Sequence, residues 1–282
     1  MAGNGNIDFF CLECYTDKSE VNTLQTEVIK IDRENMDLDA LKRAGEILKS
    51  GGLVAFPTET VYGLGGDGLH EESSRKIYEA KGRPSDNPLI VHVADMEHLE
   101  KIVKKVPKAA YKLAEAFWPG PMTMILEKND LVPYGTTGGL DTVAIRMPSD
   151  PIALELIRQG GGYIAAPSAN TSGRPSPTTA QHVYEDLQGK IPMILDGGAV
   201  TIGLESTIVD LTEEIPTILR PGFISLDMVQ AVLGEAQIDR GLIANDSNIH
   251  PKAPGMKYRH YAPKADLKIV EGPMEQGISY IN

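Results

Sequence analysis

Two cations that are separated by a glycine and followed by a proline are the first candidates for chemistry in this chain. Lys81 and Arg83 flank Gly82, and Pro84 restricts the backbone on their C-terminal side. Held in this way, the two side chains can contact several phosphate oxygens, and Arg83 can make a two-pronged contact. The same residues could also be the basic end of a helix that stabilises the helix dipole. The spacing alone leaves both interpretations open.

A turn rich in hydroxyl groups precedes the two cations. An apolar run at 53–56 ends at Pro57, and two threonines, a glutamate and a tyrosine follow before the glycines of 63–68. We interpret this turn as one wall of a site for an anionic substrate. The glycines fit the dinucleotide pattern G-x-G-x-x-G, but that pattern belongs to the first tight turn after a strand, and here six residues intervene. We therefore expect a loop that passes close to ligand or sheet.

Further hydroxyl groups and cations follow later apolar runs. The run at 163–166 leads into P-S-A-N-T-S-G-R-P-S-P-T at 167–178. Open α/β sheets bind ligands at the carboxyl ends of their strands. A helix N-cap at 178 or 179 explains only part of this cluster. Residues 204–210 and 219–222 repeat the pattern, with small hydroxyls or a cation beside an apolar run.

Several catalytic classes lack their motifs in this chain. The sequence contains no G-x-x-x-x-G-K-[ST] phosphate loop, no G-x-S-x-G elbow and no H-E-x-x-H among its six histidines. Cys11 and Cys14 have C-x-x-C spacing, but a closed zinc site needs four ligands. We interpret them as ordinary cysteines, and we predict no protein site for a resident metal.

The elements that must hold these residues alternate between strand and helix. Strands are expected at 28–31, 53–56, 89–93, 122–126, 142–147, 163–166, 192–195, 206–211 and 217–219. Helices are expected at 38–48, where Asp37 is the cap, and at 73–80, 96–104, 107–118, 150–158, 179–187 and 225–233. This alternation predicts an α/β fold, with some antiparallel neighbours where only short loops intervene.

The composition is that of a chain able to bury a core. Of its 282 residues, 41% are hydrophobic and 23% are charged. No apolar run approaches the roughly 20 residues of a membrane helix, and the N-terminus lacks the features of a secretory signal. We therefore expect a cytoplasmic protein without membrane contact. A net charge of −12 argues against nucleic-acid binding over the whole surface, but it leaves room for a local basic cleft.

Five of these motifs occur in one order and together resemble the YrdC-type family of L-threonylcarbamoyladenylate synthases. They are F-P-T-E-T-V-Y-G-L-G, K-G-R-P-S-D-N-P-L, P-S-A-N-T-S-G-R-P-S-P-T, S-T-I-V-D and L-R-P-G, spread over about residues 30–235. The resemblance implies a twisted open mixed sheet flanked by helices, with a concave cationic cleft. The segment 257–263 further resembles the interdomain linker of the longer, two-domain branch.

The resemblance also implies a reaction. Such nucleotidyltransferases join L-threonine, bicarbonate and ATP, accompanied by Mg²⁺, into threonylcarbamoyl-AMP and pyrophosphate. Downstream machinery uses the product for the N6-threonylcarbamoyl modification of adenosine 37 in tRNA. Threonine's amine is first carboxylated to a carbamate, which attacks the α-phosphate, so positioning and charge neutralisation would supply most of the catalysis.

Roles pass to this chain residue by residue through the matching motifs. The residues expected to hold L-threonine are Thr60, His92, Arg146 and Ser206, with Arg146 suited to the carboxylate. Those expected to hold ATP are Lys81, Arg83, Asn87, Thr142, Ser168, Ser176, Arg220 and Tyr261, and of these Lys81 and Arg83 are expected to be catalytic. His260 and Tyr261 would fold over the cleft as a lid. Without the resemblance, His92 could be a packed strand histidine and Arg146 a surface cation.

The predicted organisation has four parts. They are a flexible N-terminal arm at 1–27, a catalytic domain at 28–235, a linker or lid segment at 236–266 and the start of a truncated C-terminal domain at 267–282. Two other functions compete with the synthase. One is an RNA-binding module that uses the basic cleft, although only 6% of residues are aromatic. The other is a carbamoyl-transfer domain of the kind found in hydrogenase-maturation proteins.

Overall fold

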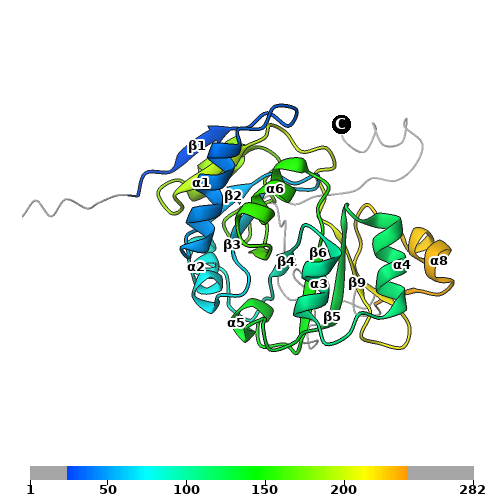
Figure 1. The fold of residues 1–282 in the computed structure, drawn as a ribbon. Helices are drawn as coiled ribbons and strands as arrows, with labels where there is room; N and C mark the ends of the chain where they lie inside the picture. The colour runs from blue at the N-terminus through cyan, green and yellow to red at the C-terminus, as the bar shows by residue number, and fades with distance from the viewer. Residues whose placement is uncertain (1–23, 240–282) are drawn as a thin grey trace, which may run out of the picture.

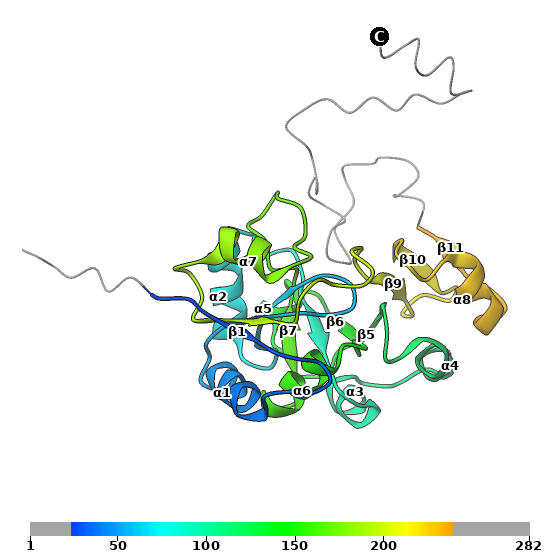
Figure 2. The same ribbon diagram turned by 90° about the horizontal axis from the view of Figure 1, so that it is seen from above.

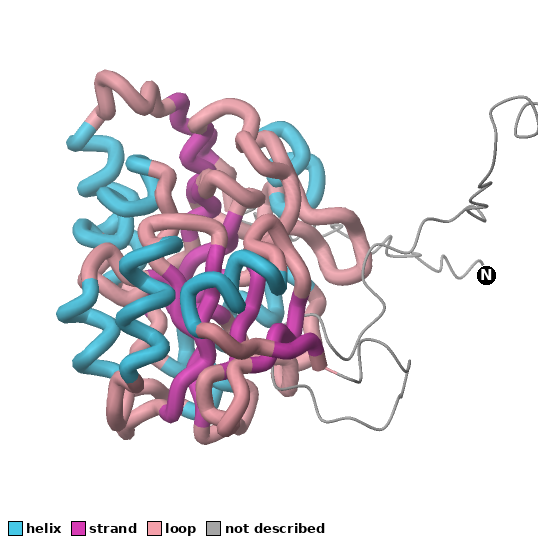
Figure 3. Tube along the Cα trace, turned by 90° about the vertical axis from the view of Figure 1, so that its right-hand side faces the viewer, coloured by secondary structure: helices cyan, strands magenta, loops and turns pink. Residues whose placement is uncertain are grey.

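An eleven-stranded mixed sheet organises the fold, and helices lie on both sides of it (Figures 1 and 3). The computed structural model describes residues 24–239. The predicted lid with Tyr261, Cys11 and Cys14, and the predicted truncated domain lie outside the described residues. Within 24–239, none of the helices combines the length and apolar composition that crossing a membrane demands.

The strands follow the predicted positions closely and add two that were not predicted. In chain order they are β1 (Glu27–Lys30), β2 (Val54–Phe56), β3 (Gly63–Asp67), β4 (Ile90–His92), β5 (Met122–Glu127), β6 (Thr142–Arg146), β7 (Ile164–Ala166), β8 (Met193–Asp196), β9 (Thr207–Asp210), β10 (Thr217–Arg220) and β11 (Gln237–Ile238). Their order across the sheet is β1-β8-β2-β3-β7-β4-β6-β5-β9-β10-β11. The sheet contains parallel pairs such as β4–β6 and antiparallel pairs such as β5–β6, which confirms the mixed sheet.

The helices are short and mostly capped by side chains. They are α1 (Leu38–Lys49), α2 (Glu71–Lys81), α3 (Met96–Ile102), α4 (Lys108–Phe117), α5 (Tyr134–Thr137), α6 (Pro151–Gln159), α7 (Ala180–Leu187) and α8 (Leu226–Leu233). Asp37 caps α1 as predicted, because its carboxylate accepts a hydrogen bond of 3.0 Å from the backbone of Ala40. Helix α3 ends earlier than predicted because Val103 leaves the helix to bridge Lys128.

The glycine run predicted as a loop is strand β3. It pairs antiparallel with β2 and with β7. Side chains of the neighbouring strands occupy the space that larger residues would need. A Cβ atom on Gly65 would lie 2.8 Å from Ile164 Cγ2 and 2.9 Å from Phe56 Cε1. The glycines therefore allow close approach within the sheet, and the expectation of a loop was wrong.

One half of the sheet is covered by helices on both faces. Val54 and Phe56 point toward α1 and α6, whereas Ala55 between them points toward α2 and α7. Figure 2 shows these two pairs of helices on opposite sides of the strands. Alternation along a strand places successive side chains on opposite faces, so both faces of β2 are buried.

The other half, from β4 to β9, is covered differently. One face packs against α3, α4 and α8 through Val91, Met124, Ile145 and Val209. The opposite face carries a small apolar cluster of strand residues, namely Ile90, Ile125, Ala144, Ile208 and Leu219. No helix of the described residues belongs to this cluster. The candidate site lies over this face.

Candidate active site

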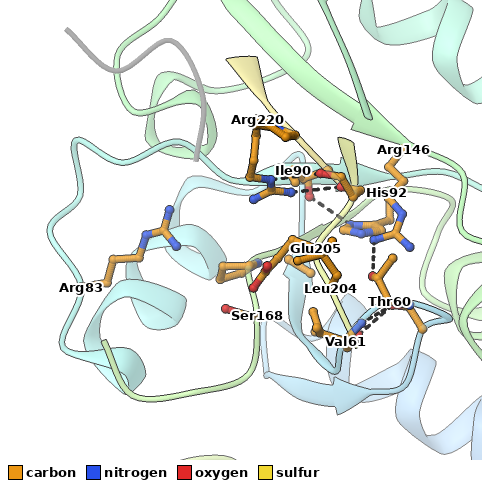
Figure 4. Close-up of a pocket in the computed structure, with 16 residues that line it drawn as sticks. Thr60, Val61, Arg83, Ile90, His92, Arg146, Ser168, Leu204, Glu205 and Arg220 are labelled. Atoms are coloured by element: carbon orange, nitrogen blue, oxygen red, sulfur yellow. Dashed lines mark hydrogen bonds between the residues drawn. The ribbon is translucent and has the colours of Figure 1, made fainter. Parts of the chain in front are cut away.

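A pocket of about 370 Å³ lies over β4 and β6. Its walls come from the turn after β2, the turn after β7 and the segments around β9 and β10. Seven of the predicted site residues line it, namely Thr60, Arg83, His92, Arg146, Ser168, Ser206 and Arg220. Figure 4 shows Arg83 at one end, Thr60, His92 and Arg146 at the other, and Glu205 and Arg220 between them. The fold thus brings together predicted site residues that are up to 160 positions apart in the sequence (220 − 60).

Arg146 is buried at one end of the pocket. It is the last residue of β6 and is only 4% exposed. Its Nη1 donates a hydrogen bond of 2.9 Å to Thr60 Oγ1, and its Nη2 lies 2.7 Å from Glu59 Oε1. The Nη2 atom makes no aligned hydrogen bond within the described residues. A guanidinium fixed on two sides with unused hydrogen-bonding capacity suits a carboxylate ligand.

In the turn after β2, hydrogen bonds determine the direction in which the Thr60 hydroxyl donates its proton. Thr58 Oγ1 donates to the backbone oxygen of Val61 at 2.7 Å and lies 2.9 Å from Thr60 Oγ1. Because each hydroxyl has one proton, Thr60 must donate to Thr58 and accept from Arg146. One lone pair of Thr60 then remains for a donor such as an amine. The side chains of this turn therefore form a small hydrogen-bond network, which also includes Arg146.

His92 is a neutral part of the pocket wall. It pairs with Arg146 across β4 and β6, and its Nδ1 lies 3.1 Å from the backbone oxygen of Ile90. Burial, and then the positive charge of Arg146, lower the pKa of His92 to about 3. The imidazole is therefore uncharged near neutral pH. His92 is packed edge-on to Phe56, with ring centroids 6.1 Å apart, so it is a core histidine and a pocket residue at once.

Ser206 and Arg220 lie side by side at the middle of the pocket. Arg220 Nε donates to the backbone oxygen of Ser206, and Arg220 Nη2 donates to the Ser206 hydroxyl, each at 3.0 Å. The same hydroxyl lies 2.8 Å from Thr123 Oγ1. These contacts fix the direction in which the guanidinium can face a ligand.

Arg83 enters the pocket because α2 ends in a left-handed residue. Gly82 has φ = 61° and turns the chain away from the helix axis. Arg83 Nη2 then donates to the backbone oxygens of Asn87 and Pro88 at 3.3 and 3.2 Å. The loop 83–88 thus orients the arginine, in agreement with the fixed cation inferred from the sequence.

Lys81 does not line the pocket but holds one of its loops. It is 2% exposed, and its ammonium group donates to the backbone oxygens of Ser168 and Asn170. Burial, and then the charge of Arg83, lower the pKa of Lys81 well below its usual value. The contact with Ser168 nevertheless joins two predicted ATP-binding residues. The catalytic role predicted for Lys81 stays a prediction.

Three further predicted residues lie around the pocket rather than on its wall. Asn87 is buried, and its Oδ1 has no hydrogen-bond partner in the described part of the chain. Ser176 donates to the carboxylate of Glu205, which does line the pocket. Thr142 begins β6 and shares the face of Arg146 by strand alternation, but it lies beyond the pocket. Tyr261 falls outside the described residues.

Two acidic residues of the site were missed from the sequence. Glu59 pairs with Arg146, and Glu205 lines the pocket. Both stand inside motifs that the sequence had already singled out, next to Thr60 and Ser206. Each could have been noticed because it is the one acidic residue in a turn made otherwise of apolar and hydroxyl-bearing residues. Three arginines and Glu205 line the pocket, and its cationic character stays a prediction because Glu59 balances Arg146.

The described residues offer no cluster for a protein-held metal ion. No group of three or more His, Cys, Asp or Glu side chains within 24–239 is arranged to bind one. The Mg²⁺ expected to accompany ATP stays a prediction.

The sequence matches the models of two known protein families. A model of the Sua5/YciO/YrdC family, described as "Telomere recombination", matches residues 46–222. A second model, described as "Threonylcarbamoyl-AMP synthase, C-terminal domain", matches residues 224–280. The boundaries predicted from the sequence stay predictions.

Two relatives and one solved structure are similar over most of the chain. A protein from Pyrococcus abyssi named threonylcarbamoyl-AMP synthase is 52% identical over 244 residues, which cover 86% of this chain and 72% of that protein. A protein of the same name from Bacillus subtilis is 52% identical over 237 residues, covering 84% and 68%. The crystal structure of P. abyssi Sua5 complexed with L-threonine has a TM-score of 0.86 at 51% identity, covering 90% of this chain and 74% of that one. With a family model over more than half of its length, this chain belongs to the Sua5/YciO/YrdC family.

Proposed function

We propose that this chain is a threonylcarbamoyl-AMP synthase. It would form threonylcarbamoyl-AMP and pyrophosphate from L-threonine, bicarbonate and ATP. The observation that carries the proposal is the buried Arg146, hydrogen-bonded to Thr60 at one end of the pocket. Two relatives at 52% identity bear this name, and a structure at 51% identity was solved with L-threonine.

The amino-acid end of the pocket would bind L-threonine through complementary groups. Arg146 would contact the carboxylate, and the free lone pair of Thr60 would accept a hydrogen bond from the amine. Ser206 would contact the side chain or the carboxylate from the opposite wall. His92 is uncharged there, so it adds shape and polarity without attracting a second anion.

ATP would occupy the part of the pocket that extends from Arg220 in the middle to Arg83 at the end. Two oriented guanidinium groups can neutralise charge that develops on the phosphates, with Ser168 beside them. Mg²⁺ would enter as part of the nucleotide substrate and would shield the leaving pyrophosphate. Asn87, Ser176 and Thr142 would extend the site at its edges, and Lys81 would support it by holding the Ser168 loop.

The reaction then needs no covalent enzyme intermediate. The threonine amine attacks the carbon of bicarbonate, and loss of water leaves a carbamate. A carbamate oxygen attacks the α-phosphorus of ATP, and pyrophosphate leaves. The protein contributes proximity and charge neutralisation, which suits a site whose groups are fixed by hydrogen bonds and burial.

The product would serve the modification of tRNA at position 37 through a transfer machinery that accepts threonylcarbamoyl-AMP. RNA contact by this chain is a separate part of the proposal. Binding of tRNA that weakens with salt and that ATP competes away would support such contact at the pocket.

The test is incorporation of radiolabelled bicarbonate into a nucleotide product by the full chain. Incorporation and pyrophosphate release are expected only when threonine, bicarbonate and ATP are all present. Pyrophosphate release from ATP that does not depend on threonine would contradict the proposal.

A further inference from the structure

Glu59 is a buried carboxylate beside the pocket that the proposed reaction does not use. It is 8% exposed and does not line the pocket. Its Oε1 lies 2.7 Å from Arg146 Nη2, and its Oε2 accepts a hydrogen bond of 3.2 Å from the backbone of Ser149. Glu59 therefore reaches the ligand end only through Arg146.

The backbone around Glu59 also supports the opposite wall of the pocket. The carbonyl oxygen of Glu59 accepts hydrogen bonds from Ile202 N at 2.9 Å and from Thr201 Oγ1 at 3.2 Å. The carbonyl oxygen of Thr60 accepts from Gly203 N at 3.0 Å. Because these contacts are to the segment that leads to Glu205 and Ser206, the position of Glu59 is fixed from two sides.

The charge balance at Arg146 has a consequence for ligand choice. A buried guanidinium without a counter-ion would attract whatever anion is available, because an uncompensated charge is costly inside a protein. The proposed reaction brings a carboxylate, a carbamate and a triphosphate into one pocket. With Glu59 in place, Arg146 carries little net charge to offer, and its remaining interaction is directional hydrogen bonding.

We propose that Glu59 is a positioning and specificity residue for the amino-acid substrate. It holds Arg146 Nη2 and balances its charge, so that this end of the pocket binds one oriented carboxylate and rejects phosphate groups. The inference rests on the proposed function, since it assumes that Arg146 meets the carboxylate of L-threonine.

The test compares the wild-type full chain with Glu59→Gln, which keeps the shape and removes the charge. In the presence of inorganic phosphate, KM for threonine is expected to rise about tenfold because phosphate then occupies Arg146, while KM for ATP changes by less than about twofold. Inorganic phosphate is expected to compete with threonine in the variant and not in the wild type. An unchanged KM for threonine together with an unchanged inhibition pattern would overturn the inference.

Two further variants separate charge from folding. Asp150→Asn weakens a second carboxylate–arginine pair near Glu59, in which Nη2 of the partly exposed Arg33 lies 2.9 Å from Oδ2 of the buried Asp150. It should lower the melting temperature without making phosphate compete with threonine. Glu59→Asp keeps the charge, so phosphate should still not compete even if KM for threonine rises. Competition by phosphate in Glu59→Asp would overturn the inference even if Glu59→Gln does not fold.

The outcome is distinct from failure of the proposed function. If wild-type pyrophosphate release does not depend on threonine, the proposed function itself fails. If the wild type behaves as a synthase and neither Glu59 variant shows its expected pattern, only the role of Glu59 is wrong.

Discussion

Arg220 binds Ser206 twice, through Nε to the backbone oxygen and through Nη2 to the hydroxyl, each at 3.0 Å. The first residue was predicted to hold ATP and the second to hold L-threonine. Their contact therefore connects the part of the pocket expected to bind ATP with the part expected to bind L-threonine. A change at Arg220 should therefore affect both substrates.

Replacing Arg220 with lysine tests this connection. Lysine keeps the positive charge but cannot reproduce two parallel contacts from one planar group. We expect KM to rise for both ATP and threonine by about tenfold, corresponding to about 1.4 kcal/mol. Steady-state pyrophosphate release with each substrate varied in turn measures both constants. An effect on ATP alone would show that the contact with Ser206 does not couple the two ends.

Replacing Arg146 with lysine should act on threonine far more than on ATP. The variant loses the hydrogen bond to Thr60 and the close pair with Glu59 while it keeps a cation. We expect threonine affinity to fall by about 100-fold, or about 3 kcal/mol, since a buried charged contact is broken. Calorimetric titration with threonine and with ATP gives both affinities. Arg158→Lys, at an exposed position on α6, is the matched control and should change neither.

The buried His92 should make stability fall in mild acid. Its pKa is about 3 in the folded chain, against about 6.5 in the unfolded chain. Between these values the unfolded chain binds one more proton, so the free energy of unfolding is complete above pH 6.5 and falls as the pH is lowered. The slope from this group approaches about 1.4 kcal/mol per pH unit.

Urea unfolding at pH 5 to 8 measures that slope in the wild type and in His92→Gln. The variant should lose less stability than the wild type between pH 6.5 and pH 5. His182→Gln on the exposed surface of α7 should keep the wild-type slope. Parallel curves for wild type and His92→Gln would show that His92 is protonated in the folded chain.

Adding a methyl group at Gly65 should strain the sheet beneath the pocket. The new Cβ would lie 2.8 Å from Ile164 Cγ2, so Gly65→Ala should cost about 1–3 kcal/mol of unfolding free energy. Combining it with Ile164→Ala removes one of the two close contacts and leaves the one with Phe56 Cε1 at 2.9 Å, so the double variant should be more stable than the sum of the single effects predicts. Additive losses in urea unfolding would mean that Ile164 is not the residue against which the new methyl group is strained.

The motifs identified residues that line the pocket, but they did not identify the hydrogen-bond and ion-pair partners of those residues. Thr60, Ser168 and Arg220 could be grouped because each stands near the end of an apolar run, and strand ends of one sheet meet in space. Arg146 was assigned to the site only through the family resemblance. Alternating apolar runs also located nearly every strand, because buried strands have a strong signal in the sequence. The long-range partners of those residues have no such signal.

Three features show what the sequence did not reveal. The pairing of Arg146 with Glu59 joins the end of β6 to the turn after β2, although β3, β7 and β4 lie between these two strands in the sheet. The burial of Lys81 depends on the loop at 168–170, which no local pattern places against α2. Strand β3 was hidden because its glycines have low strand propensity, and the close packing of Ile164 and Phe56 that requires Gly65 arises only in the folded sheet.

The half-covered sheet gives this site an all-or-nothing character. Along β6, Ala144 and Arg146 point to the face of the sheet on which the pocket lies, and Val143 and Ile145 point to the helices. A slip of one residue between β6 and β4 would exchange these sets and drive a guanidinium among apolar side chains. The buried charge would make a chain with the wrong register unstable, so such a chain would not fold into an enzyme with reduced activity. The same register of β6 therefore both fills the core and places Arg146 in the site.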